Sequence, residues 1–499
     1  MGFVGEVIAF MAYLFVFTMG LGVLAVIVMY VIDRTQTKHA VRRNYPVVGR
    51  FRYTFEELGE FFRQYFFAMD REEMPFNRAE RSWAYRAAKN VDNTVAFGST
   101  RDLRRTGTAI FVNTPWPTLD QEAVPTSPVT IGADTPTPYT TSHFFHISGM
   151  SFGALSRPAV RALSKGAAIA GCWLNTGEGG LSPYHLEGGC DLVFQIGTAK
   201  YGVRKPEGGF DEDKLREVAA HEQVRMFEIK ISQGAKPGKG GILPGVKVTP
   251  EIAAIRGIPA GQDSISPNRH PEIERPEQLL DMIRYLHEVT GKPVGFKSVI
   301  GSYGWVEDLF WEASARGPLY TPDFISVDSG DGGTGAAPMA LMDNVGLSVR
   351  ETLPRVVDIL METGMRDRVK VIAAGKLITP EGVAWALCAG ADFVVSARGF
   401  MFALGCIQAM KCNRNTCPTG VTTHDRKLQR GLVPEDKAVR VAQYQQNMEK
   451  EVCVIAHSCG VAEPRRLRRF HCRMVLDTGW TEPLDALFPY REVPSAREA

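Results

Sequence analysis

The stretch VKVIAAGKLITPEGVAWALCAGADFVVSARG (369–399) contains the pattern that decides the fold. Two short apolar runs, 369–374 and 392–397, each lead into a polar loop with a glycine, and PEGVAWALCAG between them has helical apolar spacing. Short apolar runs bounded by turn residues are typical of strands buried on both faces of a parallel sheet. The stretch therefore predicts two parallel strands joined by a helical crossover.

The same pattern occurs six more times toward the N-terminus. The runs are FFHIS (144–148), CWLNT (172–176), DLVFQI (191–196), MFEIKIS (226–232), PVGFKSV (293–299) and FISVDS (324–329). Helix-like stretches separate most of them, such as RPAVRALSKGAAIA (157–170), DKLREVAAHEQV (213–224) and PEQLLDMIRYLHEVT (276–290). Eight strands alternating with helices predict an α/β fold, a (β/α)8 TIM barrel. An open doubly wound sheet is less favoured, because no G-x-G-x-x-G follows the first strand.

Glycine-rich segments follow the strands, where the catalytic loops of a barrel lie. They are SGMSFGALS, NTGEGG, SQGAKPGKGG, DSGDGGTG, AAGK and SARG. Glycine allows backbone amides to approach a ligand closely, and phosphate is the usual ligand of such loops. Six such loops at one end of the barrel predict a large phosphorylated cofactor.

The N-terminus departs from this globular pattern. Residues 7–32, VIAFMAYLFVFTMGLGVLAVIVMYVI, contain no charge and are long enough to span a bilayer. A cleavable signal would have a basic start, but Glu6 is the one charge before the run. Six basic residues follow it: Arg34, Lys38, Arg42, Arg43, Arg50 and Arg52. The positive-inside rule then predicts a single-pass anchor in the inner (cytoplasmic) membrane, with the catalytic domain in the cytoplasm.

Composition narrows the class of protein. The 499 residues carry a formal net charge of +2 and are 44% hydrophobic, which gives no indication of nucleic-acid binding. Nine cysteines are too few for a disulfide scaffold of this length. The expected domains are a transmembrane anchor (1–33), a helical linker or cap (34–100), the barrel (101–430) and a C-terminal helical extension (431–499). The Pro/Thr-rich stretch 113–140 is expected to be an extended covering loop.

Three of the nine cysteines lie close together in GCIQAMKCNRNTCPTG (405–420), with the spacing C-x5-C-x4-C. A structural zinc site more often has paired cysteines and a fourth ligand. A disulfide is disfavoured in a reducing compartment. Iron–sulfur ligation, which uses thiolates, and simple burial of the thiols are the other two interpretations.

Five motifs occur together and in order: MSFGALS (150–156), NTGEGG (175–180), QGAKPGKGGILPGVKV (233–248), SGDGGTGAAP (329–338) and LGCIQAMKCNRNTCPTGV (404–421). In these motifs the chain resembles the synthase domain of glutamate synthase. The resemblance implies an oxidoreductase acting on CH–NH2 donors, a (β/α)8 flavoprotein that carries FMN and a three-iron (3Fe–4S) cluster. It implies hydride transfer from reduced FMN to 2-iminoglutarate, formed from 2-oxoglutarate and ammonia, in glutamate biosynthesis.

The resemblance also assigns residues. Lys236, Glu178 and Gln233 are expected to be catalytic, and Arg256, Lys236 and Gln233 to bind the 2-oxo acid. The expected FMN-binding residues are Ser151, Lys297, Asp331, Gly332, Gly333, Gly375, Lys376 and Gly399. The expected cluster ligands are Cys406, Cys412 and Cys417.

Three departures from the family pattern affect the expected partners. No cysteine precedes Cys172, so ammonia is expected from solution or from a glutaminase partner. No dinucleotide fingerprint is visible, so electrons are expected from ferredoxin or a separate NAD(P)H-oxidising flavoprotein. Lys239 and Ile242 stand where the family usually has Glu and Gln.

Two alternative functions stay open. One is an amine-glutamate (N-alkylglutamate) synthase or imine reductase on the same scaffold, which Lys239 and Ile242 motivate. The other is a membrane-tethered flavin and iron–sulfur electron-transfer subunit. The presence of Lys236, Gln233 and Arg256 argues against the second, because an electron relay needs no dicarboxylate site.

Overall fold

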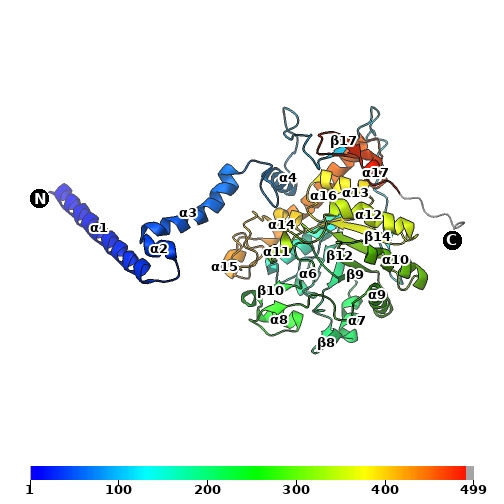
Figure 1. Ribbon diagram of the computed structural model, residues 1–499, viewed down its shortest axis with the longest axis horizontal. Coiled ribbons are helices and arrows are strands. Elements are labelled where there is room, and N and C mark those ends of the chain that lie inside the picture. Colours follow the sequence, from blue (N-terminus) through cyan, green and yellow to red (C-terminus); the bar gives the residue numbers. More distant parts are fainter. Residues whose placement is uncertain (1, 491–499) are drawn as a thin grey trace. The chain divides into compact units, whose positions relative to one another are not determined.

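The computed structural model describes residues 2–490. The chain divides between Glu80 and Arg81 into two compact units (Figure 1). The first unit is helical and consists of α1 (Phe3–Thr35), α2 (Ala40–Asn44), α3 (Val48–Phe62) and the π-helical turn η1 (Arg63–Phe67). Helix α4 (Arg78–Ala88) contains the point of division.

Eight parallel strands of the second unit form a closed barrel. They are β4 (Phe145–Ile147), β5 (Leu174–Asn175), β6 (Leu192–Ile196), β9 (Val224–Lys230), β12 (Val294–Val299), β13 (Phe324–Asp328), β14 (Lys370–Ala374) and β15 (Phe393–Ser396). They are the eight predicted strands, in chain order, and β15 pairs with β4 to close the ring, with Val395 opposite His146. The predicted TIM-barrel fold with an N-terminal apolar helix is confirmed.

Helices follow the strands, as the alternating pattern predicts. The main ones are α5 (Arg157–Ala170), α7 (Glu212–Ala220), α9 (Pro276–Thr290), α10 (Gly304–Arg316), α12 (Val349–Glu362), α13 (Pro380–Ala389) and α16 (Pro434–Ser458). Helix α5 shows why these segments start and stop where they do. The Ser156 hydroxyl accepts a bond from the Ala159 amide at 3.3 Å, and the helix ends at Gly171, whose φ of 74° favours glycine.

Two predicted segments need correction. The helix expected over 213–224 ends at Ala220, because strand β9 already begins at Val224. The covering loop expected over 113–140 contains a strand, β2 (Val129–Ile131), which forms an antiparallel hairpin with β3 (Tyr139–Thr141). Ile131 and Tyr139 of this hairpin belong to the same buried cluster as barrel residues such as Trp173. The hairpin therefore completes the core beneath the barrel.

The C-terminal region combines helix and sheet. Helix α16 packs against α5 on the outside of the barrel. Strand β1 (Ala109–Phe111) pairs with β16 (Cys472–Val475), which pairs with β17 (Thr481–Pro483). The expected helical extension thus contains the strands β16 and β17 as well as helices, and its last residues, 491–499, lie outside the described residues.

Short elements make up the connections. They are α6 (Pro183–Leu186), β7 (Arg204–Lys205), β8 (Gly208–Phe210), β10 (Ile242–Leu243), η2 (Gly245–Lys247), α8 (Pro250–Arg256), β11 (Ser264–Ile265), α11 (Met339–Met342), α14 (Arg398–Leu404), α15 (Arg426–Gln429), η3 (Pro464–Arg466), η4 (Arg469–His471) and α17 (Leu484–Leu487).

Helix α1 is long and apolar enough to cross a membrane. Its most apolar window has a mean hydropathy of 2.6, and none of that window is buried in the protein. The helix includes the whole predicted run, and the membrane attachment itself stays a prediction.

A buried ion pair joins α9 to the start of β13, and we expect it to make stability depend on pH. His287 Nε2 lies 2.7 Å from Asp323 Oδ2, and His287 Nδ1 lies 2.8 Å from the Leu319 carbonyl oxygen. Both partners are acceptors, so only the doubly protonated ring can donate to both. Burial opposes the charge, but these bonds outweigh it and raise the pKa of His287 above 6.5.

The folded state therefore holds this proton more tightly than the unfolded state does. The stabilisation is fully present below pH 6.5 and is lost as the pH rises through the folded-state value. His287→Gln should lower the apparent melting temperature by about 2 °C or more at pH 6 and by less at pH 9. Thermal melts of both proteins across this range test it. A difference in melting temperature between wild type and His287→Gln that grows with pH would contradict the raised pKa of His287.

Candidate active site

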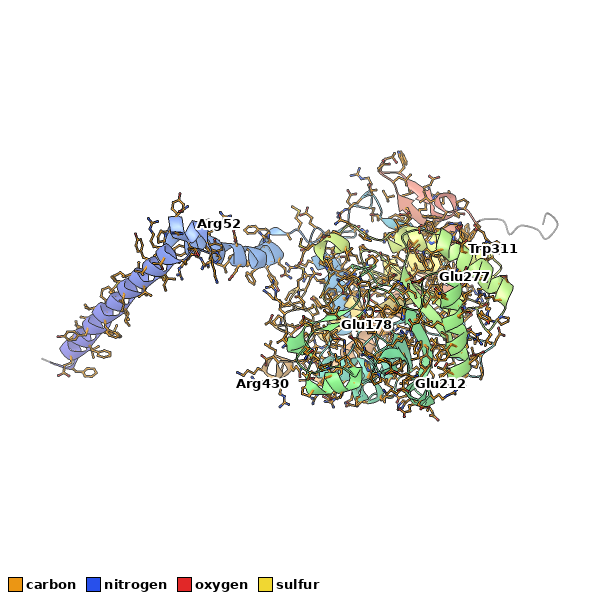
Figure 2. The ribbon with its side chains drawn as sticks, turned by 60° about the horizontal axis from the view of Figure 1, so that its bottom comes forward. Arg52, Glu178, Glu212, Glu277, Trp311 and Arg430 are labelled. Carbon is orange, nitrogen blue, oxygen red and sulfur yellow. The ribbon has the colours of Figure 1, made fainter. Side chains whose placement is uncertain are left out.

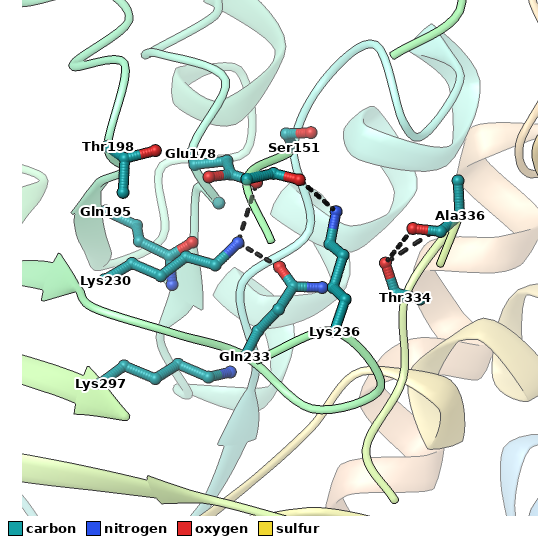
Figure 3. A network of polar contacts seen from close by, with 12 residues as sticks. Ser151, Glu178, Gln195, Thr198, Lys230, Gln233, Lys236, Lys297, Thr334 and Ala336 are labelled. Carbon is teal, nitrogen blue, oxygen red and sulfur yellow. Dashed lines mark hydrogen bonds and ion pairs between the residues drawn. The ribbon is translucent and has the colours of Figure 1, made fainter. Parts of the chain in front are cut away.

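A network of charged side chains lies at the C-terminal ends of the barrel strands (Figure 3). Glu178 follows β5, Lys230 ends β9, and Gln233 lies in the loop after β9. Lys230 Nζ lies 2.9 Å from Glu178 Oε1 and also donates to Gln233 Oε1. In Figure 2, Glu178 lies within the body of the second unit. The strand order thus brings together residues from two separate loops.

Two buried cations next to this network lack a carboxylate partner. Within the described part of the chain, the Lys236 side chain donates only to the Gly240 carbonyl oxygen, at 3.4 Å, although Lys236 is 4% exposed. Arg256, at the end of α8, donates weakly to Ser264 Oγ at 3.3 Å and to Ser151 Oγ at 3.4 Å. No carboxylate of residues 2–490 forms an ion pair with either cation within 4 Å. Because buried charges are normally paired, both are suited to an anionic ligand.

The cations determine the ionisation of Glu178. Burial acts to raise the pKa of this carboxyl group, but the charges of Lys230, Lys236 and Arg256 together lower it. Burial lowers the pKa of Lys236 to about 8; Glu178 opposes this shift and Lys230 adds to it. Glu178 is therefore ionised at neutral pH, while the pKa of Lys236 lies close to neutral pH.

Glycines make room for the Glu178 carboxylate. A Cβ atom on Gly197 would lie 2.5 Å from Glu178 Oε2, and one on Gly241 would lie 2.7 Å from Oε1. Neither position can carry a side chain without moving the carboxylate. The glycines of these loops thus leave space for the Glu178 carboxylate, and they also allow a ligand to approach the backbone.

A pocket opens beside the network, at the C-terminal ends of the barrel strands. Four basic side chains line it: Lys230, Lys297, Lys376 and Arg398. Lys297 Nζ lies 3.1 Å from Asp328 Oδ2. Burial acts to lower the pKa of Lys297, but Asp328 and the nearby Glu228 outweigh it and raise the pKa. The excess of cations suits an anionic or phosphorylated ligand.

The structure brings four of the eight expected cofactor residues to this pocket, together with the expected catalytic residue Gln233. Among its lining residues are the expected Gln233, Lys297, Gly333, Gly375 and Lys376.

Four expected cofactor residues lie outside the lining. Asp331 forms an ion pair with Lys376 at 3.0 Å, and Gly332 packs on the backbone of Gly234. Ser151 lies beside the Arg256 guanidinium. Gly399 faces α16, because a Cβ atom there would lie 2.2 Å from the Tyr444 hydroxyl oxygen. For Gly399, helix packing accounts for the glycine.

Comparison with known proteins shows the family of this chain. The family model described as a conserved region in glutamate synthase matches residues 116–462. The chain belongs to the glutamate synthase family. It is 39% identical to the glutamate synthase large subunit-like protein YerD of Bacillus subtilis, over 89% of this chain and 91% of that protein.

A second relative is the archaeal glutamate synthase (NADPH) of Methanocaldococcus jannaschii, 34% identical over 64% of this chain and 60% of that protein. Among solved structures, an oxidised active mutant of (S)-mandelate dehydrogenase matches with a TM-score of 0.47 and 12% identity, over 79% of this chain and 98% of that one. The resemblance to the glutamate synthase family is confirmed, and with it the prediction of a glutamate-synthase-like oxidoreductase.

The cysteine segment of this glutamate synthase family member follows α14. The thiols of Cys406, Cys412 and Cys417 interact electrostatically with one another. Burial raises the pKa of Cys406 to about 12. For Cys417, burial acts to raise the pKa, but hydrogen bonds from Thr419 and Thr422 outweigh it and lower the pKa. Over residues 2–490, no three His, Cys, Asp or Glu side chains are close enough together to hold a metal ion. The cluster stays a prediction.

Sequence reasoning missed several residues of the site. Lys230, Asp328 and Arg398 line the pocket, and Glu228 lies beneath it inside the barrel. A usable signal was present, since FEIKIS places a glutamate and a lysine in a strand expected to be buried on both faces. Buried charges are rare unless they are paired, so two in one strand indicate a site.

Proposed function

We propose that this protein reductively aminates 2-oxoglutarate to L-glutamate through 2-iminoglutarate. The observation that carries the proposal is a pair of buried cations, Lys236 and Arg256, that have no carboxylate partner among the described side chains. A dicarboxylate can place one carboxylate on each, and a guanidinium can bind its carboxylate through two parallel hydrogen bonds. The reaction consumes 2-oxoglutarate, ammonium, two electrons and two protons, and releases glutamate and water.

The side chains of the network have separate tasks in this proposal. Lys236 holds the substrate and polarises its carbonyl group. Glu178, ionised among three cations, accepts a proton from ammonium at a carboxylate oxygen, so that the neutral amine can attack. Lys230 fixes the position of that carboxylate, and Gln233, held by Lys230, offers its amide group to the substrate.

The neighbouring pocket fits FMN by its chemistry. Lys297, Lys376 and Arg398 provide positive charge for a phosphate and for a reduced flavin, and Gly333 and Gly375 leave the backbone accessible. When bound, FMN supplies the hydride chemistry that no amino-acid side chain can provide. The similarity to the archaeal glutamate synthase and to the glutamate synthase large subunit-like protein YerD supports this assignment.

We propose that the cysteine segment holds a 3Fe–4S cluster through Cys406, Cys412 and Cys417. Each iron of such a cluster takes one thiolate, so the three thiols need not converge on a single ion as they would at a mononuclear site. Three thiols in one short segment are the donor set that iron–sulfur clusters use, and Lys247 supplies a nearby positive charge. The cluster would pass electrons from a partner, ferredoxin or a separate NAD(P)H-oxidising flavoprotein. Helix α1 would hold the protein at the inner membrane with the barrel in the cytoplasm.

A second candidate differs only in the amine. Ile242 pairs with Ile265 in the hairpin formed by β10 and β11, and Lys239 is exposed in the loop before it. An aliphatic residue here, in place of the usual glutamine, favours a larger and less polar amine than ammonia. An N-alkylglutamate synthase would use the same cation pair.

The cofactor content and the turnover test these assignments together. We expect anaerobically purified protein to contain FMN and about three irons per chain, and Cys412→Ser to lose the iron and keep the flavin. With a chemical reductant of low potential, wild type should convert 2-oxoglutarate and ammonium to glutamate. Absorption spectra, metal analysis and product analysis with ammonium or methylamine provide the readouts.

The outcomes separate the hypotheses. Flavin without iron would contradict the cluster and leave the amination untouched. Faster turnover with methylamine would favour the N-alkylglutamate synthase. Both cofactors without turnover of any 2-oxo acid would overturn the amination and favour an electron-transfer subunit.

A further inference from the structure

The segment after α1 leaves an apolar stripe uncovered. Along α3 and η1, apolar residues follow one another at intervals of three and four, so they share one helix face. Their side chains are between 41% and 67% exposed: Val48, Phe51, Phe55, Leu58, Phe62 and Tyr65. In Figure 2 the side chains along this helix, including the labelled Arg52, point outward. A continuous exposed apolar face normally contacts a partner molecule or a membrane.

An ion pair between the buried Asp33 and the partly exposed Arg50 fixes where this stripe begins. Asp33, at the end of the apolar run of α1, is 1% exposed. Arg50 of α3 binds it through two parallel contacts, Nε to Oδ2 and Nη2 to Oδ1, both at 2.8 Å. The Val47 amide also donates to Asp33 Oδ2 at 3.0 Å. The first turn of α3 is therefore held at the level where the apolar part of α1 ends.

The surroundings of the stripe suit phospholipid. Exposed basic residues lie at this corner, among them Arg34, Lys38 and Arg43, which can contact phosphate groups. The stripe is rich in aromatic rings, which favour the boundary between headgroups and acyl chains. An ordinary helix–helix seam is less suited, because exposed Phe66 and Phe67 lie outside the stripe and widen the apolar face.

We propose that α3 and η1 lie in the surface of a phospholipid bilayer, with the aromatic stripe at the ends of the acyl chains and the corner arginines at the phosphates. The inference rests on the proposed membrane attachment through α1. It adds a second, in-plane contact that fixes how the chain leaves the membrane. A second copy of this chain, packed on the stripe, is the competing occupant.

Photolabelling of the full chain tests the contact. The protein is reconstituted in vesicles of phosphatidylcholine and phosphatidylglycerol that contain a diazirine-bearing phosphatidylcholine, and labelled peptides are identified by mass spectrometry. We expect label in α1 and in residues 48–67. The variant Phe51→Ser/Phe55→Ser/Phe62→Ser should lower label in 48–67 about fivefold and leave α1 labelling unchanged. The matched control Thr54→Ser/Glu57→Ser alters exposed polar positions of the same helix and should label like wild type.

The two proposals fail in different ways. Label in α1 with none in 48–67 would overturn the in-plane contact and leave the anchor standing. Absence of label from α1 would overturn the anchor. Protein–protein crosslinks through 48–67 in place of lipid label would show that a second copy covers the stripe, which also overturns the proposal.

Discussion

Replacing Lys236 by methionine is expected to lower kcat/KM for 2-oxoglutarate by about 10²–10³-fold, the size of effect seen when one charge-stabilising group is removed from an active site. Methionine keeps the length and the apolar stem of lysine and removes only the ammonium group. Lys236 is buried and has no carboxylate partner in the described chain. Removing its ammonium group should therefore leave few polar groups of the empty site without a hydrogen-bond partner. Flavin content and melting temperature should stay near those of wild type.

The pH dependence of the activity distinguishes a substrate contact from a purely structural role of Lys236. Burial lowers the pKa of Lys236 to about 8, so the fraction of protonated Lys236 falls as the pH rises through that value. Activity that needs the ammonium group should decline above about pH 8. Lys236→Arg, which stays charged, should keep part of the activity and lose this decline.

A neighbouring lysine provides the control. Lys239 lies in the same loop and is exposed, so Lys239→Met should keep kcat/KM within about threefold of wild type. Lys236→Met with activity close to wild type would contradict a substrate contact. Loss of flavin from Lys236→Met would instead assign Lys236 to cofactor binding.

The barrel could be predicted from the sequence because its signal is local. Each strand is a short apolar run, and each run is followed by turn residues, so eight strands could be identified without any long-range information. The helix predicted over 213–224 is too long at its C-terminal end, because no proline or glycine separates it from β9. The β2–β3 hairpin was missed because its strands have three residues each and lie among prolines and threonines.

The site could be predicted only where glycine loops and family motifs marked it. Lys230 was overlooked because its importance depends on Glu178, which is distant in the sequence and close in the fold. The packing of Tyr444 of α16 against Gly399 could not be predicted either, because nothing local in the sequence reveals it. Pairing between distant side chains is a property of the closed barrel, so a local pattern does not contain it.

Replacing Glu228 by alanine is expected to destabilise the barrel by about 3–5 kcal/mol, because it leaves several buried polar groups unpaired. Glu228, on β9, is 3% exposed and accepts three hydrogen bonds inside the barrel. Asn175 Nδ2 and Gln195 Nε2 donate to its Oε1 at 2.8 and 2.7 Å, and Ser326 Oγ donates to its Oε2 at 2.5 Å. The donors come from β5, β6 and β13, so the carboxylate connects four strands. We expect a fall of about 10 °C in the apparent melting temperature, with loss of bound flavin.

The glutamine variant separates hydrogen bonding from charge. In Glu228→Gln the amide oxygen can keep both bonds at the Oε1 position, and the amide nitrogen can donate to Ser326, whose hydroxyl can also accept. Most of the stability should return, while Lys297 loses one of the three carboxylates that raise its pKa. Glu222→Ala, in the exposed turn before β9, should melt like wild type. If Glu228→Gln melts as low as Glu228→Ala, the negative charge opposite Lys297, and not the hydrogen bonding, holds this layer of the barrel together.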